Sequence, residues 1–219
     1  MNEVIRLNFV LVNTYLIKGT DGYILIDSGV PYMFSKVKEA IIKAGCEYDQ
    51  LKLIILTHGD IDHTGNAVAL KKTFNTRIAM HKADYAMVKN GQLIRRELKG
   101  LFWKIACRIY EHIGQPNPDF EVDVFLNEGQ RLDEYGISAQ VIHIPGHTSG
   151  SIAILTDDGM LISGDIISNQ IKPEFSDLIE NREMILSSLE RIKQIQPKMI
   201  FPGHGKPFLK ESLETIKVD

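Results

Sequence analysis

One short stretch of the chain holds an unusual number of side chains that can bind a metal ion. It reads Leu-Thr-His-Gly-Asp-Ile-Asp-His-Thr-Gly-Asn and runs from Leu56 to Asn66. Between His58 and His63 it packs two imidazoles and two carboxylates. Histidine nitrogens and aspartate oxygens are the ligands that borderline and hard divalent ions prefer. The stretch therefore predicts metal binding. The alternative is a polar turn whose Asp and His residues only cap the next helix.

Further His and Asp residues stand beside glycine, each at the end of an apolar run of strand length. Loops held by rigid strands are common places for functional groups. Any one of these loops is weak evidence for a site, because polar turns are ordinary. The segments are Asp27-Ser-Gly29, Pro145-Gly-His-Thr148, Ser163-Gly-Asp165 and Pro202-Gly-His-Gly205.

The elements that must position these residues begin with an antiparallel sheet. Residues 4–17 are almost all strand formers, and we expect Asn13 and Thr14 to interrupt the run. Asp21-Gly22 predicts a hairpin turn before a strand over 23–27.

Strands and helices alternate along most of the remaining chain. Apolar residues three and four apart, followed by Gly45, predict a helix over 33–44. A short apolar run over 51–56 predicts a strand, with the His/Asp stretch at its end and a helix from Ala67 onward. The same patterns predict strands over 76–80, 121–126, 129–132, 138–144, 152–156, 160–163 and 198–201, and helices over 184–195 and 209–216.

Residues 82–118 differ in character from the rest of the chain. They carry seven Lys or Arg against three Asp or Glu, and the only tryptophan, Trp103, lies among apolar residues at helical spacing. The pattern predicts a helical insert within a single domain that spans residues 1–219. The insert is either a lid that supplies apolar and cationic contacts to a substrate, or a helix that packs on the sheet or on the partner of a homodimer.

Composition excludes several classes of protein. The net charge of −3 gives no bulk attraction to nucleic acid or to an anionic membrane. No apolar run approaches the ~20 residues that span a bilayer, and the start of the chain lacks the pattern of a signal peptide. We therefore expect a cytoplasmic protein that acts on a small molecule. Cys46 and Cys107 have no CxxC spacing and are interpreted as reduced thiols without a catalytic role.

Taken together and in this order, the His and Asp loops resemble the motifs of the metallo-β-lactamase-fold superfamily of metal-dependent hydrolases. The resemblance covers essentially the whole chain. It implies an α/β (α+β) fold of four layers, an αββα sandwich with the metal site along one edge of the sheets. Layer rules alone require only that strands and helices surround one core.

The resemblance also implies a dinuclear metal site. Carried over by position, His58 and His147 belong to the first metal site, Asp62, His63 and His204 form the second, and Asp165 bridges the two ions. Asp27 resembles the aspartate of the superfamily that orients a ligand histidine through the ring nitrogen that does not bind the metal. His81 and His143 match no ligand position and are expected to be structural. His112 has no ligand cluster around it and is expected to be a surface or core histidine.

Asp60 departs from the pattern of the superfamily, which usually has a histidine at this place. As a ligand, Asp60 would add a third carboxylate and reduce the positive charge of the site. A less positive site lowers the pKa of bound water less, and it suits iron or manganese better than zinc. The alternative is that Asp60 turns away and that one ion binds at the second site.

Three functions follow from this pattern. The first is a hydrolase with two divalent ions, zinc first and iron or manganese as the alternatives, acting on an ester, thioester or lactone carbonyl with Asp62 as the catalytic carboxylate. The second is a non-haem iron redox or dioxygenase-type member of the same fold, which Asp60 favours. The third is a binding module without turnover, and the retention of six other ligand-type residues argues against it.

Overall fold

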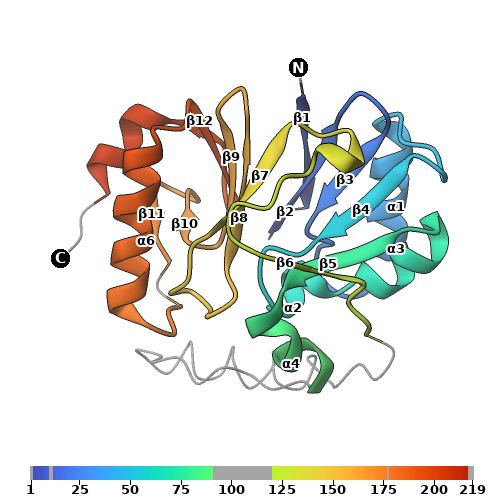
Figure 1. Ribbon diagram of the computed structural model, residues 1–219, viewed down its shortest axis with the longest axis horizontal. Helices are drawn as coiled ribbons and strands as arrows, with labels where there is room; N and C mark the ends of the chain where they lie inside the picture. The colour runs from blue at the N-terminus through green and yellow to red at the C-terminus, as the bar shows by residue number, and fades with distance from the viewer. Residues whose placement is uncertain (1, 10–11, 91–119, 177, 217–219) are drawn as a thin grey trace.

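Two β-sheets lie face to face, and helices cover the outer face of each one (Figure 1). The computed structural model describes residues 2–9, 12–90, 120–176 and 178–216. This is the four-layer αββα arrangement that the motifs imply, so the prediction of the fold class is confirmed.

The first sheet has six strands in the order β1-β2-β3-β4-β5-β6. The first three pair antiparallel and the remaining pairs are parallel. The hairpin expected at Asp21-Gly22 joins β2 to β3, where Gly22 has a positive φ that favours glycine. The strands are β1 Glu3–Phe9, β2 Val12–Lys18, β3 Tyr23–Ile26, β4 Leu51–Ile55, β5 Arg77–His81 and β6 Val124–Leu126.

The second sheet has five strands in the order β13-β12-β9-β8-β7. β8 and β9 form a hairpin across Asp157-Asp-Gly159, and β12 runs parallel to β9. A separate two-stranded ribbon pairs β10 with β11. The strands are β7 Ala139–His143, β8 Ile152–Thr156, β9 Met160–Gly164, β10 Ile167–Ser168, β11 Glu174–Phe175, β12 Met199–Pro202 and β13 Phe208–Leu209.

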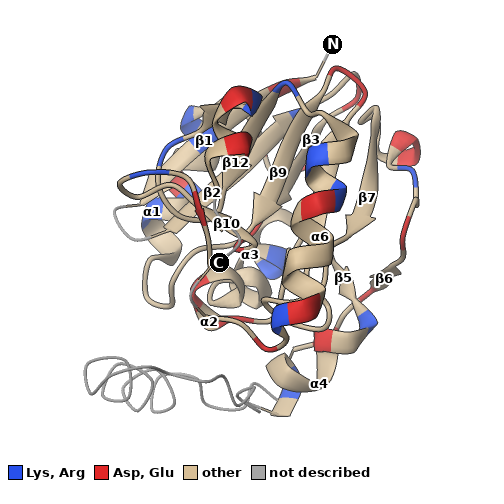
Figure 2. Ribbon diagram, turned by 90° about the vertical axis from the view of Figure 1, so that its left-hand side faces the viewer, with Lys and Arg blue, Asp and Glu red and all other residues tan. Residues whose placement is uncertain are grey.

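The helices divide between the two outer faces. α1 and α3 cover the six-stranded sheet, and α6 covers the five-stranded sheet (Figure 1). Charged residues of both signs lie along α6, while its apolar stripe packs on the sheet (Figure 2). The helices are α1 Phe34–Lys43, α2 Ile61–Thr64, α3 Ala67–Phe74, α4 Lys82–Asn90 and α6 Arg182–Ile195, with 3-10 turns η1 Asp133–Tyr135 and η2 Lys210–Thr215.

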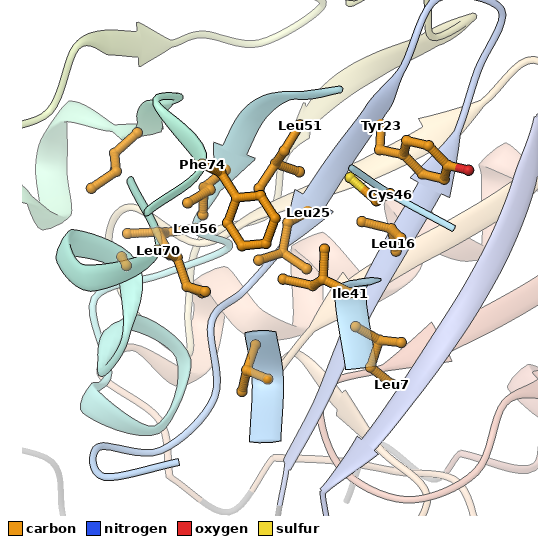
Figure 3. Close-up of a cluster of buried hydrophobic side chains, with 14 of the residues drawn as sticks. Leu7, Leu16, Tyr23, Leu25, Ile41, Cys46, Leu51, Leu56, Leu70 and Phe74 are labelled. Carbon is orange, nitrogen blue, oxygen red and sulfur yellow. The ribbon is translucent and has the colours of Figure 1, made fainter. Parts of the chain in front are cut away.

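Three layers of buried apolar side chains hold the sandwich together. One lies between the two sheets and is built from alternate residues of both, such as Ile24, Leu53 and Ile154. The second joins α6 to the five-stranded sheet. The third joins α1 and α3 to the six-stranded sheet and contains Ile41 and Phe74 (Figure 3).

Truncation of this third layer is expected to destabilise the protein strongly. Phe74 is fully buried against the sheet, and its ring stacks on Tyr48 at 5.3 Å between centroids. Phe74→Ala should lower the free energy of unfolding by about 3–5 kcal/mol, because it leaves a cavity. Denaturant unfolding measures this loss. Tyr32→Ala is the control, since Tyr32 is 93% exposed, and an equal loss in both variants would contradict the assignment of the core.

Three expectations about the elements are wrong. Asn13 and Thr14 do not interrupt the first strand run, because both lie buried inside β2. Residues 129–132 form no strand of their own and contribute only an isolated bridge between Arg131 and Gln140. The expected final helix over 209–216 is the 3-10 turn η2, preceded by the short strand β13.

The expected insert over 82–118 is described in part. Its first nine residues form α4, which follows β5 directly and lies with α2 at one end of the sandwich (Figure 1). The remainder, with Trp103, Cys107 and His112, lies outside the described residues. The choice between a lid and a packing helix therefore stays a prediction for that part of the chain.

Candidate metal centre

The loops that carry the predicted ligands meet at one edge of the sandwich. Five strands send their carboxyl ends to this edge, and each is followed by at least one of the predicted side chains. Asp27 follows β3; His58, Asp60, Asp62 and His63 follow β4; His147 follows β7; Asp165 follows β9; His204 follows β12. Pairing within each sheet and packing between the sheets bring residues that are more than a hundred positions apart into one cluster.

The first group of ligand atoms comes from His58, His147 and Asp165. One ligand atom of each lies within 4.8 Å of the others, and all three side chains are largely withdrawn from solvent. Asp60 faces the same group. Its Oδ2 lies 3.1 Å from His147 Nε2 and 3.5 Å from His58 Nε2. The structure therefore places the Asp60 carboxylate among the atoms of the predicted first site, and not turned away from it.

The second group comes from Asp62, His63 and His204, again with ligand atoms within 4.8 Å of one another. Asp165 lies between the groups. Its Oδ2 is 2.9 Å from His204 Nε2 and 4.0 Å from His147 Nε2, and its Oδ1 is 3.2 Å from His63 Nε2. This carboxylate therefore reaches both groups, as the position of a bridging ligand requires.

Asp27 orients a histidine of each group. His63 Nδ1–H donates to Asp27 Oδ2 at 2.8 Å. The Thr57 hydroxyl donates to the same carboxylate at 2.9 Å, and it accepts from His58 Nδ1–H at 2.9 Å. Since a carboxylate only accepts, these bonds leave the Nε2 atoms of both rings facing the site. Asp27 holds this place with a φ of 62°, a left-handed conformation that Asp tolerates better than most residues.

His147 and His204 are held by different neighbours. His147 Nδ1–H donates to the carbonyl oxygen of Leu178, which leaves Nε2 toward the site. The loop of His204 is tied to the first sheet, where the Asn13 amide donates to the carbonyl oxygens of Pro202 and Gly205, each at 2.8 Å. The four histidines are thus positioned by hydrogen bonds that their rings or their loops make outside the cluster.

The electrostatics of the cluster are dominated by its carboxylates. Burial alone would raise the pKa of Asp165, but His204 and His63 outweigh it and hold that pKa well below its usual range. Burial alone would lower the pKa of His204, but Asp165 raises it to about 11. The pKa of Asp62 is lowered for the same reason as that of Asp165, with His63 and His204 opposing the effect of burial. The buried carboxylates therefore stabilise the positively charged form of a neighbouring histidine, and such an environment suits a positive charge.

The donor set fits divalent metal ions. Three buried atoms of the cluster, His58 Nε2, His63 Nε2 and Asp165 Oδ1, make no hydrogen bond within the described part of the chain. His63 Nε2 and Asp165 Oδ1 face each other at 3.2 Å, but the ring hydrogen of His63 lies on Nδ1, so both facing atoms are acceptors. A buried polar atom without a partner is costly, and imidazole nitrogen and carboxylate oxygen are metal ligands. The residues would hold one ion between His58, Asp60 and His147 and a second between Asp62, His63 and His204, with Asp165 shared.

His81 and His143 belong to neither of the two groups of ligand atoms. Their rings stack on each other at 4.3 Å between centroids. His143 is partly exposed and its Nε2 bonds to the carbonyl oxygen of Ser149. Cys46 is buried in the layer under α1, and burial raises the pKa of its thiol to about 12, which makes it unreactive near neutral pH.

Sequence patterns alone do not reveal three residues that bond to the ligands or to their loops. The polarity of Asn13 predicts a break in a strand, although a polar residue inside a buried strand is a signal of such a role. Thr57 directly precedes the first histidine, and no local pattern marks its hydroxyl. Asp84 contributes only a charge to the pattern of residues 82–118, and its contact with Thr148 depends on packing between distant elements.

Comparison with known proteins decides the family. The model of the metallo-beta-lactamase superfamily matches residues 7–204. The chain belongs to this superfamily. The "Probable metallo-hydrolase MJ0888" of Methanocaldococcus jannaschii is 30% identical over 199 residues, which cover 89% of this chain and 87% of that protein. The "Beta-lactamase-like protein 2 homolog" of Drosophila melanogaster is 31% identical over 199 residues, or 88% of this chain, and the match spans 58% of the fly protein.

Solved structures of the superfamily superpose on the chain over nearly its full length. TTHA1623, in a di-iron-bound form, has a TM-score of 0.71 at 25% identity, with 97% of this chain and 96% of that chain covered. ST1585 from Sulfolobus tokodaii, described as an archaeal metallo-beta-lactamase superfamily protein, has a TM-score of 0.71 at 23% identity, with 98% and 83% covered. Among the described residues, no helix is long and apolar enough to cross a membrane.

Proposed function

We propose that this superfamily member is a hydrolase with two divalent metal ions that cleaves an ester, thioester or lactone bond. The observation that carries the proposal is the pair of His/Asp groups that share Asp165, with buried His58 Nε2 and His63 Nε2 lacking hydrogen-bond partners in the described chain. A pair of metal ions held by these residues would polarise a carbonyl oxygen and would lower the pKa of a water molecule enough for attack near neutral pH.

Residues of the chain supply the remaining functions of such a site. Asp62 is 24% exposed at its side chain, more than Asp60 at 6% or Asp165 at 9%. Its Oδ2 lies 3.4 Å from His204 Nε2. A carboxylate with this access can orient a water molecule and take up or pass on a proton at Oδ2, as general acid–base catalysis requires.

The proposed metals follow from the charges of the ligands. Zinc is the first choice, because four of the seven predicted ligands are histidines. The third carboxylate, Asp60, makes the first group harder and more negative, which supports iron or manganese as alternatives. The proposed substrate is a small molecule, since the net charge of −3 gives no support for nucleic acid.

A second candidate is a non-haem iron redox or dioxygenase-type protein. Two observations favour it: the carboxylate of Asp60 lies within the first group, and TTHA1623 carries two irons. Iron held in place of zinc would allow electron transfer or oxygen chemistry that zinc does not perform. The tests of the two candidates therefore share the same starting point, the metal content of the purified protein.

The experiment is a hydrolysis assay with controlled metal content. Metal-free protein, prepared with a chelator, should have no activity on a panel of ester, thioester and lactone substrates. Zinc or manganese should restore turnover of at least one substrate class, with two ions bound per chain. An iron-loaded protein that is inactive on the whole panel but is reduced and reoxidised reversibly would contradict the hydrolase and support the second candidate.

A further inference from the structure

Asp84 is a buried carboxylate that is neutralised by no lysine or arginine in the described chain. It lies in the first turn of α4 and is 1% exposed. Its Oδ2 accepts from the backbone N–H of Gly59 at 2.9 Å and from the Thr148 hydroxyl at 2.7 Å. Its Oδ1 accepts from the backbone N–H of Gly150 at 2.7 Å. One side chain therefore joins two loops that come from different sheets.

Both of these loops carry ligands of the first metal group. Gly59 stands between His58 and Asp60, and Thr148 follows His147 directly. The ligands of the second group lie elsewhere, on α2 and on the loop after β12. The three hydrogen bonds of Asp84 described above reach neither α2 nor the β12 loop. The carboxylate is thus placed to set the spacing of one group of ligands and not of the other.

The contact of α4 with these loops depends on glycine at position 150 and is close at Gly59. A Cβ on Gly150 would lie 2.5 Å from Asp84 Cγ and Oδ1, so any larger residue would push the carboxylate away. A Cβ on Gly59 would lie 3.1 Å from the Met87 sulfur, one turn further along α4. The two loops therefore pack closely against α4 at the same place where Asp84 forms its hydrogen bonds.

We propose that Asp84 is the positioning residue of the first metal site. By holding the loops of His58 and His147 at a fixed separation, it sets the distance across which the first ion is bound. The proposal rests on the proposed dinuclear function. It differs from a general stabilising role, because it assigns the effect of Asp84 to one metal ion of the pair.

The variant that tests the proposal is Asp84→Asn, which keeps size and shape. An amide has a single acceptor oxygen, so its NH₂ group must face at least one of the N–H donors that the carboxylate accepts. We expect the affinity of the first site for Zn²⁺ to fall about 10- to 100-fold. This is the usual effect of losing a hydrogen-bonding group that orients metal ligands without binding the metal itself. The affinity of the second site should stay within about twofold of that of the wild type.

Asn13→Ala is the matched control, because Asn13 is also 1% exposed and holds a ligand loop by its side chain. That loop carries His204, so this variant should weaken the second site and spare the first. Thr148→Val removes one of the three bonds to Asp84 and leaves the carboxylate in place. It should give a smaller loss at the first site, and it keeps the test sound if Asp84→Asn fails to fold.

The measurement is a calorimetric Zn²⁺ titration of the metal-free protein. Each variant is combined with His147→Ala, which disables the first site, and with His204→Ala, which disables the second. Asp84→Asn should have no further effect beside His147→Ala and its full effect beside His204→Ala. Equal weakening of both sites, or no change, would overturn the proposal while leaving a two-ion wild type intact. A wild type that binds fewer than two ions would contradict the proposed function itself.

Discussion

Replacement of Asp27 by alanine is expected to remove both metal ions from the purified protein. Asp27 bonds directly to His63 and, through the Thr57 hydroxyl, to His58. Its loss would leave a ring of each site without a fixed orientation. Losing such a partner typically costs about 10- to 100-fold in metal affinity at one site, so a combined loss of about 100- to 10,000-fold is expected. Elemental analysis after dialysis measures it.

Two controls separate this effect from simple loss of folding. Asp27→Asn keeps a residue that tolerates the φ of 62°, and it should retain more metal than the alanine variant. Asp133→Ala removes an exposed carboxylate that bonds to Arg131 on the surface and should retain both ions. Retention of two ions by a folded Asp27→Ala protein would show that Asp27 does not orient the ligands.

Substitution of Asp60 is expected to change the number and the preference of the bound metals. Asp60→Ala should lower the metal affinity of the first site by more than about 100-fold. Loss of a ligand costs more affinity than loss of a group that only orients a ligand by a hydrogen bond. The second site, formed by other residues, should keep its ion. Metal stoichiometry falling from two to one is the expected result of elemental analysis.

Asp60→His is expected to shift the protein toward zinc. Imidazole suits zinc better than carboxylate does, and the exchange adds one unit of positive charge to the site. A more positive site lowers the pKa of the attacking water further, so the pH–rate profile should move to lower pH. The reverse exchange His143→Asp, at a residue outside the cluster, should leave the metal content unchanged. Unaltered zinc affinity and pH profile in Asp60→His would mean that Asp60 is not a ligand.

The sequence predicted the layers and the ligand cluster because both leave patterns in the order of residues along the chain. Apolar runs of strand length that end at Asp165 and His204 marked these residues as candidates, and the resemblance to the superfamily implied that they lie near His58. Glycine beside each of these residues marked the turns. The resemblance to the superfamily then supplied the pairing of loops, which no spacing between positions could have given.

The residues behind the ligands escaped because their roles depend on contacts between distant elements. Asn13 lies in β2 and holds a loop that is 189 positions away, whereas its polarity alone predicts a break in the strand. Asp84 lies in a charged helix, where an aspartate is ordinarily solvated. Its burial arises only when α4 packs on loops from both sheets. The strand β13 and the 3-10 turn η2 differ from the predicted final helix for a related reason. Periodicity is uninformative over the six residues of η2.

The direct test of a two-ion centre is a crystal structure with anomalous scattering recorded at the edges of zinc, iron and manganese. We predict two peaks that share Asp165. One should contact Asp60 and the Nε2 atoms of His58 and His147. The other should contact the side chains of Asp62, His63 and His204. A protein that carries no ion, or a single ion with Asp60 turned away from it, would contradict the account.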